Sequence, residues 1–268
     1  MRISVGQFRP TGVVAENVAT LRRLAESAKD DGAELVLFPE ESMFTVRHVD
    51  GPLAEAVDAG WSAFVSEITR IAADLSIAVV AGGYEPSGTG RPYNTVVAVD
   101  ATGKILGTYR KLHLYDAFKY KESDRITAGD RGTLMVELGG LRFGIMTCYD
   151  LRFPEVARSL AVAGADVVLV PAAWFKGDYK IEHWQLLLKA RAVENTVWIV
   201  AAGTRSDNTV GHSAIIDPLA VPVAFLGEEG EAIETADVTR ERIDEVRSFL
   251  PVLANRRTDV DQLGCAGS

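Results

Sequence analysis

The apolar residues recur along the chain with two different spacings, and these predict an alternation of strands and helices. Short, nearly unbroken apolar runs at residues 2–8, 33–38 and 77–81 are typical of strands that are buried on both faces. Apolar residues three or four positions apart over residues 13–31 and 61–75 predict amphipathic helices between those strands. The N-terminal part of the chain is therefore predicted to form successive βα units.

The middle of the chain has a different pattern, which predicts hairpins. Residues 93–99 pair with 104–110, and residues 133–138 pair with 141–147, because only a short polar or glycine-containing turn separates the two members of each pair. Between the hairpins, residues 111–130 form a long irregular section, and connections of that length are often functional.

The C-terminal half returns to mixed strand and helix patterns. Further strands are predicted at residues 166–170, 197–202, 211–216, 221–226 and 231–236, and further helices at residues 155–161, 181–195 and 239–248. A mixture of βα units and hairpins places the chain in the α/β class.

Length, composition and charge limit the number of domains and the classes of protein that are possible. The chain has 268 residues, of which 47% are hydrophobic, so we expect one domain over residues 1–255 with a C-terminal tail at 256–268. The net charge of −9 argues against a nucleic-acid-binding surface. No run of 18 apolar residues predicts a membrane span, and the chain enters its first strand directly. Two distant cysteines fit a reducing compartment, and we expect a cytoplasmic protein.

One cysteine occupies a position where ligands often bind. Cys148 follows the strand pattern that ends at Thr147, and Pro154 then opens a helix. In open α/β sheets, ligands bind outside the carboxyl ends of the strands. Cys148 is therefore a candidate nucleophile, although a free cysteine is also a common buried apolar residue.

Other reactive side chains follow strands in the same way. Glu40 and Glu41 follow one predicted strand and Lys111 follows another, so they would converge with Cys148 if these strands run parallel in one sheet. A carboxylate can take the proton of a thiol, and an ammonium can stabilise a thiolate and then an oxyanion. The backbone N–H of Tyr149 is a second oxyanion donor. The alternative is that these residues are unrelated.

Three segments resemble the signatures of the nitrilase superfamily of carbon–nitrogen hydrolases. They are Leu37-Phe38-Pro39-Glu40, Tyr109-Arg110-Lys111-Leu112-His113-Leu114 and Cys148-Tyr149-Asp150-Leu151-Arg152-Phe153-Pro154-Glu155. The resemblance implies a four-layer α-β-β-α sandwich and a Glu-Lys-Cys triad that needs no metal or cofactor. The family base directly follows the proline, which selects Glu40 over Glu41. Neighbouring residues at a strand end also tend to point to opposite sides.

The resemblance extends to supporting residues. A second family glutamate matches Glu122, which would orient Lys111 or assist proton transfer. Trp174 follows another strand and is a candidate wall of the substrate pocket. Arg152, Lys176 and Arg205 are candidate partners for a substrate carboxylate.

The substrate follows from the branch that the chain resembles. The nucleophile motif, together with His183-Trp184 and Leu250-Pro251-Val252, is similar to the branch of deaminated-glutathione amidase and ω-amidase. It implies hydrolysis of a small carboxylated amide through a Cys148 thioester, with deaminated glutathione preferred over α-ketoglutaramate. Family members generally form dimers, so the resemblance also implies a homodimer.

Several alternatives stay open at this point. One is a nitrilase, an N-carbamoyl amino acid amidohydrolase or an acyl transferase with the same triad. Another is a Cys–His hydrolase of a different fold, in which Cys148 pairs with His113, His183 or His212. The last is a catalytically silent binding or scaffold protein.

Overall fold

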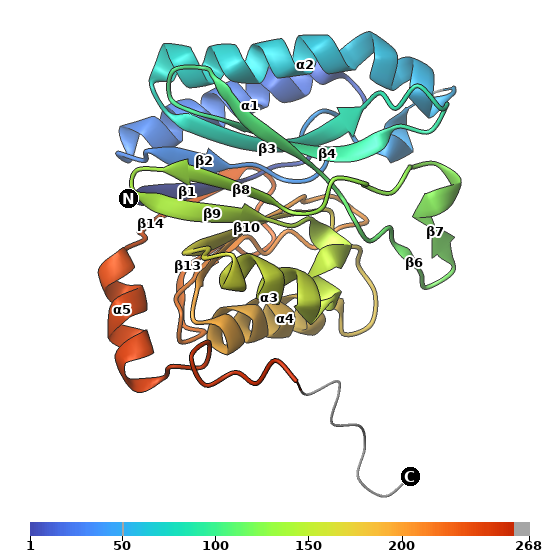
Figure 1. Ribbon diagram of the computed structural model, residues 1–268. Coiled ribbons are helices and arrows are strands. Elements are labelled where there is room, and N and C mark those ends of the chain that lie inside the picture. The colour runs from blue at the N-terminus through green and yellow to red at the C-terminus, as the bar shows by residue number, and fades with distance from the viewer. Residues whose placement is uncertain (50, 260–268) are drawn as a thin grey trace, which may run out of the picture.

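The computed structural model describes residues 1–49 and 51–259, and in them two six-stranded sheets face each other (Figure 1). The first sheet has the order β14 (Ala232–Asp237), β1 (Arg2–Gln7), β2 (Leu35–Leu37), β3 (Ala78–Glu85), β4 (Tyr93–Val99) and β5 (Ile105–Arg110). The second has the order β13 (Pro222–Phe225), β12 (Ala214–Ile216), β11 (Trp198–Gly203), β10 (Val167–Ala172), β9 (Leu141–Ile145) and β8 (Leu134–Leu138).

Helices cover the outer face of each sheet and complete four layers. The helices α1 (Val14–Asp30) and α2 (Leu53–Leu75) pack on the first sheet, and α3 (Pro154–Val162) and α4 (Lys180–Asn195) pack on the second (Figure 1). The last helix, α5 (Arg240–Phe249), lies beside the second sheet. The predicted α-β-β-α sandwich is confirmed. The division into a domain of residues 1–255 and a tail stays a prediction.

Strand β2 shows why the central strands lack alternation in the sequence. Leu35 and Leu37 belong to the apolar core between the two sheets, whereas Val36 belongs to the core under α1 and α2. All three side chains are fully buried. A strand that packs on both faces needs apolar residues at every position, so its sequence is a continuous apolar run.

Helix α2 is longer than its sequence pattern indicates. It begins at Leu53, not at the predicted Trp61, and Pro52 precedes it. Leu53, Val57 and Gly60 continue the buried face toward the N-terminus. The glycine at position 60 interrupts the apolar pattern, because its contact with the core comes from the absence of a side chain: an added Cβ would lie 2.8 Å from Met43 Cε.

The irregular section between β5 and β8 contains short elements of its own. The strands β6 (Asp116–Ala117) and β7 (Tyr120–Lys121) form a small hairpin, which leads into the 3₁₀ helix η2 (Glu122–Asp124). The hairpin projects from one end of the sandwich in Figure 1. This section carries Glu122 back toward the end of β5, where the candidate site lies.

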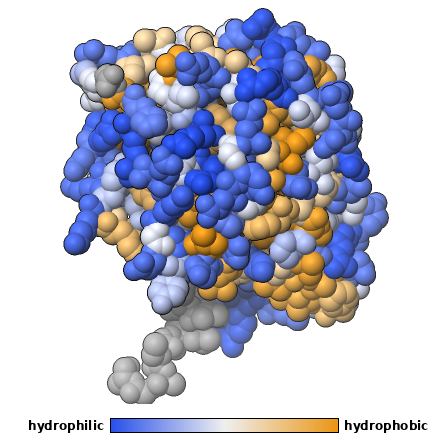
Figure 2. Space-filling view, turned by 180° about the vertical axis from the view of Figure 1, so that it is seen from behind, coloured by the Kyte–Doolittle hydropathy of each residue, from blue (hydrophilic) through white to orange (hydrophobic). Residues whose placement is uncertain are grey.

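The opposite side of the molecule carries the edge strands β13 and β14. Figure 2 shows this face, where apolar patches interrupt a largely polar surface. Val221, Val223 and Phe225 are between 44% and 51% exposed, whereas Ala224 is buried.

None of the described helices has the length and apolarity to cross a membrane. Beyond Asp259 the predicted tail, with Cys265, lies outside the described residues.

Candidate active site

The three predicted catalytic residues come from both sheets, so the condition that their strands share one sheet is not met. Glu40 follows β2 and Lys111 follows β5, and these strands run in the same direction in the first sheet. Cys148 follows β9, which belongs to the second sheet. The groups nevertheless line one pocket, because the two sheets are packed face to face.

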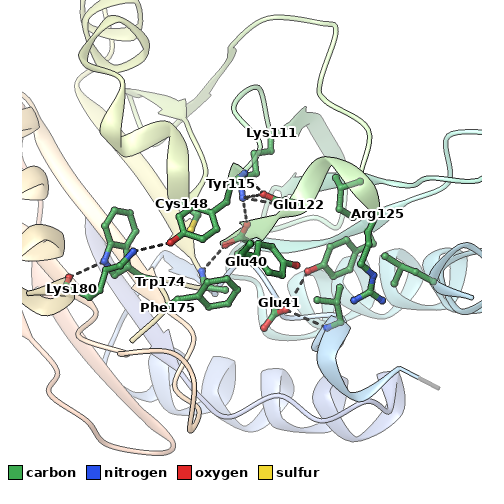
Figure 3. A pocket seen from close by; sticks show the side chains of 16 residues that line it. Glu40, Glu41, Lys111, Tyr115, Glu122, Arg125, Cys148, Trp174, Phe175 and Lys180 are labelled. Carbon is green, nitrogen blue, oxygen red and sulfur yellow. Dashed lines mark hydrogen bonds and ion pairs between the residues drawn. The ribbon is translucent and has the colours of Figure 1, made fainter. Parts of the chain in front are cut away.

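Lys111 connects two carboxylates at the centre of the site (Figure 3). Its Nζ donates to Glu40 Oε1 at 2.9 Å and to Glu122 Oε2 at 2.9 Å. Asn94 Nδ2 donates to the same two residues, at 2.6 Å to Glu40 Oε1 and 3.3 Å to Glu122 Oε1. The backbone N–H of Ala173 donates to Glu40 Oε2 at 2.6 Å. Both oxygens of Glu40 are therefore held in place.

A glycine in the neighbouring strand allows this position of Glu40. A Cβ on Gly82 would lie 2.4 Å from the carbonyl oxygen of Glu40 and 2.5 Å from its Cα. The backbone of Glu40 thus lies directly against β3, where only glycine fits.

The backbone at Cys148 has an unusual conformation. Its φ is +45°, a region that a residue with a side chain seldom adopts and that is common at functional sites. Cys148 begins the 3₁₀ helix η3 (Cys148–Arg152). The buried Asp150 fixes this turn, because it accepts hydrogen bonds from Thr147 N at 2.9 Å and from Tyr109 Oη at 2.7 Å. The next residue, Tyr149, has its N–H in the first turn, where no acceptor exists within the helix.

The surroundings determine the charge of the thiol and of the lysine. Burial raises the pKa of Cys148 well above its usual range, and the charge of Glu40 raises it further. Burial alone would lower the pKa of Lys111, but the charges of Glu122 and Glu40 outweigh this effect and raise it. These shifts favour a neutral thiol and a charged ammonium in the resting site.

The pocket around Cys148 encloses about 590 Å³ of empty space, part of which opens to solvent. Besides Glu40, Lys111, Glu122 and Cys148, its wall includes the predicted Trp174. The remaining lining residues are mostly aromatic or apolar, with three further charged groups. These are Glu41, Val46, Leu53, Tyr84, Tyr115, Tyr120, Arg125, Ile126, Ala173, Phe175 and Lys180.

Two cations lie against Trp174 in the pocket wall. Lys180 Nζ donates to Tyr115 Oη at 2.9 Å, and burial together with the charge of Arg152 lowers the pKa of this lysine. The guanidinium of Arg152 lies 4.8 Å from the ring centre of Trp174. Within the described residues, neither cation forms an ion pair with a carboxylate. Nothing in the sequence had distinguished Lys180, since only the fold brings the start of α4 to the pocket.

The other two candidate cations lie elsewhere. Arg205 Nη2 lies 3.0 Å from Glu228 Oε2, and Lys176 Nζ lies 4.0 Å from the same oxygen. Neither residue lines the pocket of Cys148; Lys176 borders a neighbouring groove. Arg152 does not line the pocket either, but its guanidinium lies against Trp174, which does.

The histidines do not support a Cys–His pair. Neither His113, His183 nor His212 lines the pocket. His113 Nδ1 lies 2.8 Å from Asp150 Oδ1, which directs its ring to the nucleophile turn and not to the thiol. In the part of the chain that the structure describes, no three His, Cys, Asp or Glu side chains are grouped so that they could hold a metal ion.

Comparisons with known proteins identify the family of the chain. The model of the carbon–nitrogen hydrolase family matches residues 2–248. A deaminated glutathione amidase of Escherichia coli O157:H7 is 38% identical over 98% of this chain and all of its own length. An omega-amidase of Danio rerio is 29% identical over 97% of this chain and 95% of its own.

A solved structure shows similar architecture and a modified cysteine. A mutant of the amidase from Nesterenkonia sp. AN1 has a TM-score of 0.82, with 27% identity over 99% of this chain and 97% of its own. In that structure, the acetamide moiety of fluoroacetamide is added covalently at the active site cysteine. The predicted resemblance to the amidase branch is confirmed. The chain belongs to the carbon–nitrogen hydrolase family of the nitrilase superfamily and is a hydrolase of the amidase type.

Proposed function

We propose that this protein hydrolyses a small carboxylated amide through a thioester on Cys148. The observation that carries the proposal is the hydrogen-bonded set of Glu40, Lys111 and Glu122 in one pocket with a thiol. A binding protein has no need of a buried ammonium between two carboxylates next to a nucleophile, because burying such charges costs free energy. Family membership favours the same conclusion.

In the first half of the reaction, the amide carbon is transferred to sulfur. Glu40 takes the proton of the Cys148 thiol, and the sulfur forms a bond to the amide carbon. The oxygen of the tetrahedral intermediate carries the negative charge, which Lys111 and the N–H of Tyr149 stabilise. When the carbon–nitrogen bond breaks, Glu40 returns its proton to the leaving nitrogen. The products of this half are an amine or ammonia and the thioester.

In the second half, water releases the acid. Glu40, again a carboxylate, takes a proton from a water molecule whose oxygen attacks the thioester carbon. The carbon–sulfur bond breaks, and the thiol regains the proton from Glu40. Glu122 contacts Lys111 through both of its oxygens and holds the ammonium in place throughout. Because the raised pKa of Cys148 favours the neutral thiol, attack depends on removal of the proton by Glu40.

The acyl half of the substrate would lie beside Lys180 and Arg152. Lys180 lines the pocket of Cys148, and Arg152 lies against the ring of Trp174 in the pocket wall; among the described residues neither cation is neutralised by a carboxylate. A substrate carboxylate would form charge-assisted hydrogen bonds there. This arrangement supports an acyl group with its own carboxylate, as the names of the similar amidases suggest. Deaminated glutathione and α-ketoglutaramate are the first compounds to test, in that order.

A substrate panel tests the proposal. Amides, nitriles and N-carbamoyl compounds, with and without an acyl carboxylate, are compared by kcat/KM from the release of ammonia or amine. We expect a carboxylated amide to lead the panel. Faster turnover of a nitrile or a carbamoyl compound would contradict the amidase assignment.

The thiol is tested in the same assay. Cys148→Ser is expected to lose on the order of 10³-fold or more in kcat. Cys265→Ser provides the matched cysteine control and should retain wild-type turnover. A Cys148→Ser variant with most of its activity would overturn the mechanism.

We also propose a homodimer in the cytoplasm, as the resemblance and the cysteine content predict. Exposed apolar residues on the helices near the nucleophile turn support the dimer: Leu186 on α4 is 64% exposed and Val162 on α3 is 52% exposed. Sedimentation at micromolar concentration should show two chains per particle.

A further inference from the structure

The pocket extends beyond the catalytic residues to a second charged end. In Figure 3, Lys180 and Trp174 lie on one side of Cys148, whereas Glu41 and Arg125 lie on the other, past Glu40. Val46, Leu53 and Ile126 add apolar wall to that end. We name the part formed by Glu41, Val46, Leu53, Arg125 and Ile126 the distal subsite.

The charged groups of the distal subsite have few partners. No hydrogen bond or ion pair involves the guanidinium of Arg125 among the described residues, although the side chain is half-buried. Glu41 is 6% exposed and has no cation within ion-pair distance in the same part of the chain. Among the described residues its Oε1 accepts two long hydrogen bonds, from Val46 N at 3.3 Å and Tyr84 Oη at 3.4 Å.

Such a pair of unsatisfied groups indicates a ligand that supplies both partners. Arg125 lacks an anion, and a half-buried guanidinium binds a carboxylate well through charge-assisted hydrogen bonds. Glu41 has hydrogen-bonding capacity left for an N–H group. Burial and the charge of Glu40 raise the pKa of Glu41 to about 7, so this carboxyl is only partly ionised near neutral pH.

The position of Glu40 decides which half of the substrate lies there. In the proposed mechanism, Glu40 returns its proton to the leaving nitrogen, so that nitrogen must lie on the Glu40 side of the thiol. The distal subsite continues the pocket on this side, whereas Lys180 lies on the other. A substrate that releases ammonia would leave the distal subsite empty.

We propose that the distal subsite binds the leaving half of the substrate, an amine that carries a carboxylate, such as an amino acid or a short peptide. Arg125 pairs with the carboxylate and Glu41 accepts an N–H of the same group. The carbon–nitrogen bond to this amine breaks as the thioester on Cys148 forms, and Glu40 supplies the proton that the amine carries away. The inference rests on the proposed function and narrows its substrate class.

Three amides that share the same acyl group test the inference. The acyl group is the one that leads the panel above, and the amides are its primary amide, its N-carboxymethyl amide and its N-carbamoylmethyl amide. The last two differ only in whether the leaving group is glycine or the uncharged glycinamide. We expect wild-type kcat/KM to favour the glycine derivative by about tenfold or more.

Two variants assign the preference to Arg125. Arg125→Gln should bring the ratio of glycine to glycinamide derivatives close to one, and Arg125→Lys should restore part of it. Arg131→Gln, at an exposed arginine outside the pocket, is the matched control and should keep the wild-type ratio. A ratio that persists in Arg125→Gln would overturn the assignment.

The outcomes separate this inference from the proposed function. Suppose that the wild type hydrolyses the primary amide but has a ratio of kcat/KM for the glycine and glycinamide derivatives near one. That result leaves the proposed function standing and overturns the distal subsite. An equal loss for all three amides in Arg125→Gln also overturns it, because the arginine would then act on the shared acyl half. If no amide with any leaving group is hydrolysed, the proposed function fails and the inference fails with it.

Discussion

The catalytic centre and the distal subsite contain adjacent glutamates in opposite situations. Glu40 accepts three hydrogen bonds of 2.6 to 2.9 Å, one of them from the ammonium of Lys111. Glu41 accepts two bonds of 3.3 and 3.4 Å and has no cationic partner among the described residues. A glutamate side chain is therefore firmly fixed in the catalytic centre and only loosely held in the distal subsite.

This difference shows how the fold separates two roles. Groups that already satisfy one another are preorganised for chemistry, because no reorganisation is needed when charge develops. Groups with unused hydrogen-bonding capacity instead leave room for a ligand. The catalytic centre of Glu40, Lys111 and Glu122 belongs to the first kind, and the distal subsite with Glu41 and Arg125 belongs to the second.

The largest expected effect is on turnover, where the two glutamates should differ most. Glu40→Gln removes the only proposed base, so kcat on a primary amide should fall by about 10³-fold. Glu41→Gln makes the same change one residue away, in the distal subsite, which a primary amide does not occupy. Its loss should stay below about tenfold.

The neighbouring substitutions control for each other, since each replaces a buried carboxyl by an amide of equal size. Circular dichroism would establish that both variants are folded. Losses of equal size would show that Glu41 takes part in the chemistry and would break the comparison between the catalytic centre and the distal subsite.

A smaller effect is expected on stability as the pH changes. The pKa of Glu41 is raised to about 7 in the folded protein from an ordinary value of 4.5, through burial and the nearby charge of Glu40. Below pH 4.5 the carboxyl is protonated in both states, and Glu41 imposes no ionisation penalty. As the pH rises from 4.5 to 7, the unfolded state ionises first, so the free energy of unfolding falls.

The resulting fall in the free energy of unfolding should reach about 3 kcal/mol near pH 7 and then level off, because Glu41 is ionised in both states above that pH. Denaturant unfolding of the wild type and of Glu41→Gln over pH 4 to 8 measures it as the difference between the two curves. The other titrating groups are common to both proteins. A difference that does not change with pH would contradict the raised pKa of Glu41.

Much of the fold could be predicted because buried strands and helices have characteristic patterns of apolar residues in the sequence. The apolar run before Glu40 predicted β2, and the Gly139-Gly140 turn predicted the β8–β9 hairpin. The start of α2 was missed, because Gly60 packs through the space its missing side chain leaves. The assignment of strands to two sheets could not be predicted, since a buried strand has the same pattern in either sheet.

Some residues of the candidate site could likewise be predicted from the sequence, and others could not. Residues directly after strands, such as Glu40, Lys111 and Cys148, could be found because strand ends are visible in the sequence. Asn94 and Lys180 could not, because they reach the site from a strand interior and a helix start, and only tertiary packing determines their neighbours. The prediction that only one of Glu40 and Glu41 faces the thiol assumed that neighbouring side chains alternate as in a strand. Strand β2 ends at Leu37, so the alternation does not apply to these two residues. Both line the pocket, although only Glu40 contacts Lys111.

The central claim is that hydrolysis passes through an acyl group on Cys148. The most direct measurement mixes the enzyme with its best amide, quenches with acid within the first turnover and locates adducts by peptide mass spectrometry. The account predicts that the peptide with Cys148 gains the mass of the acyl group no more slowly than the amine is released. Release of the amine with no acylated Cys148 peptide at any time, or with the acyl group on another residue, would contradict it.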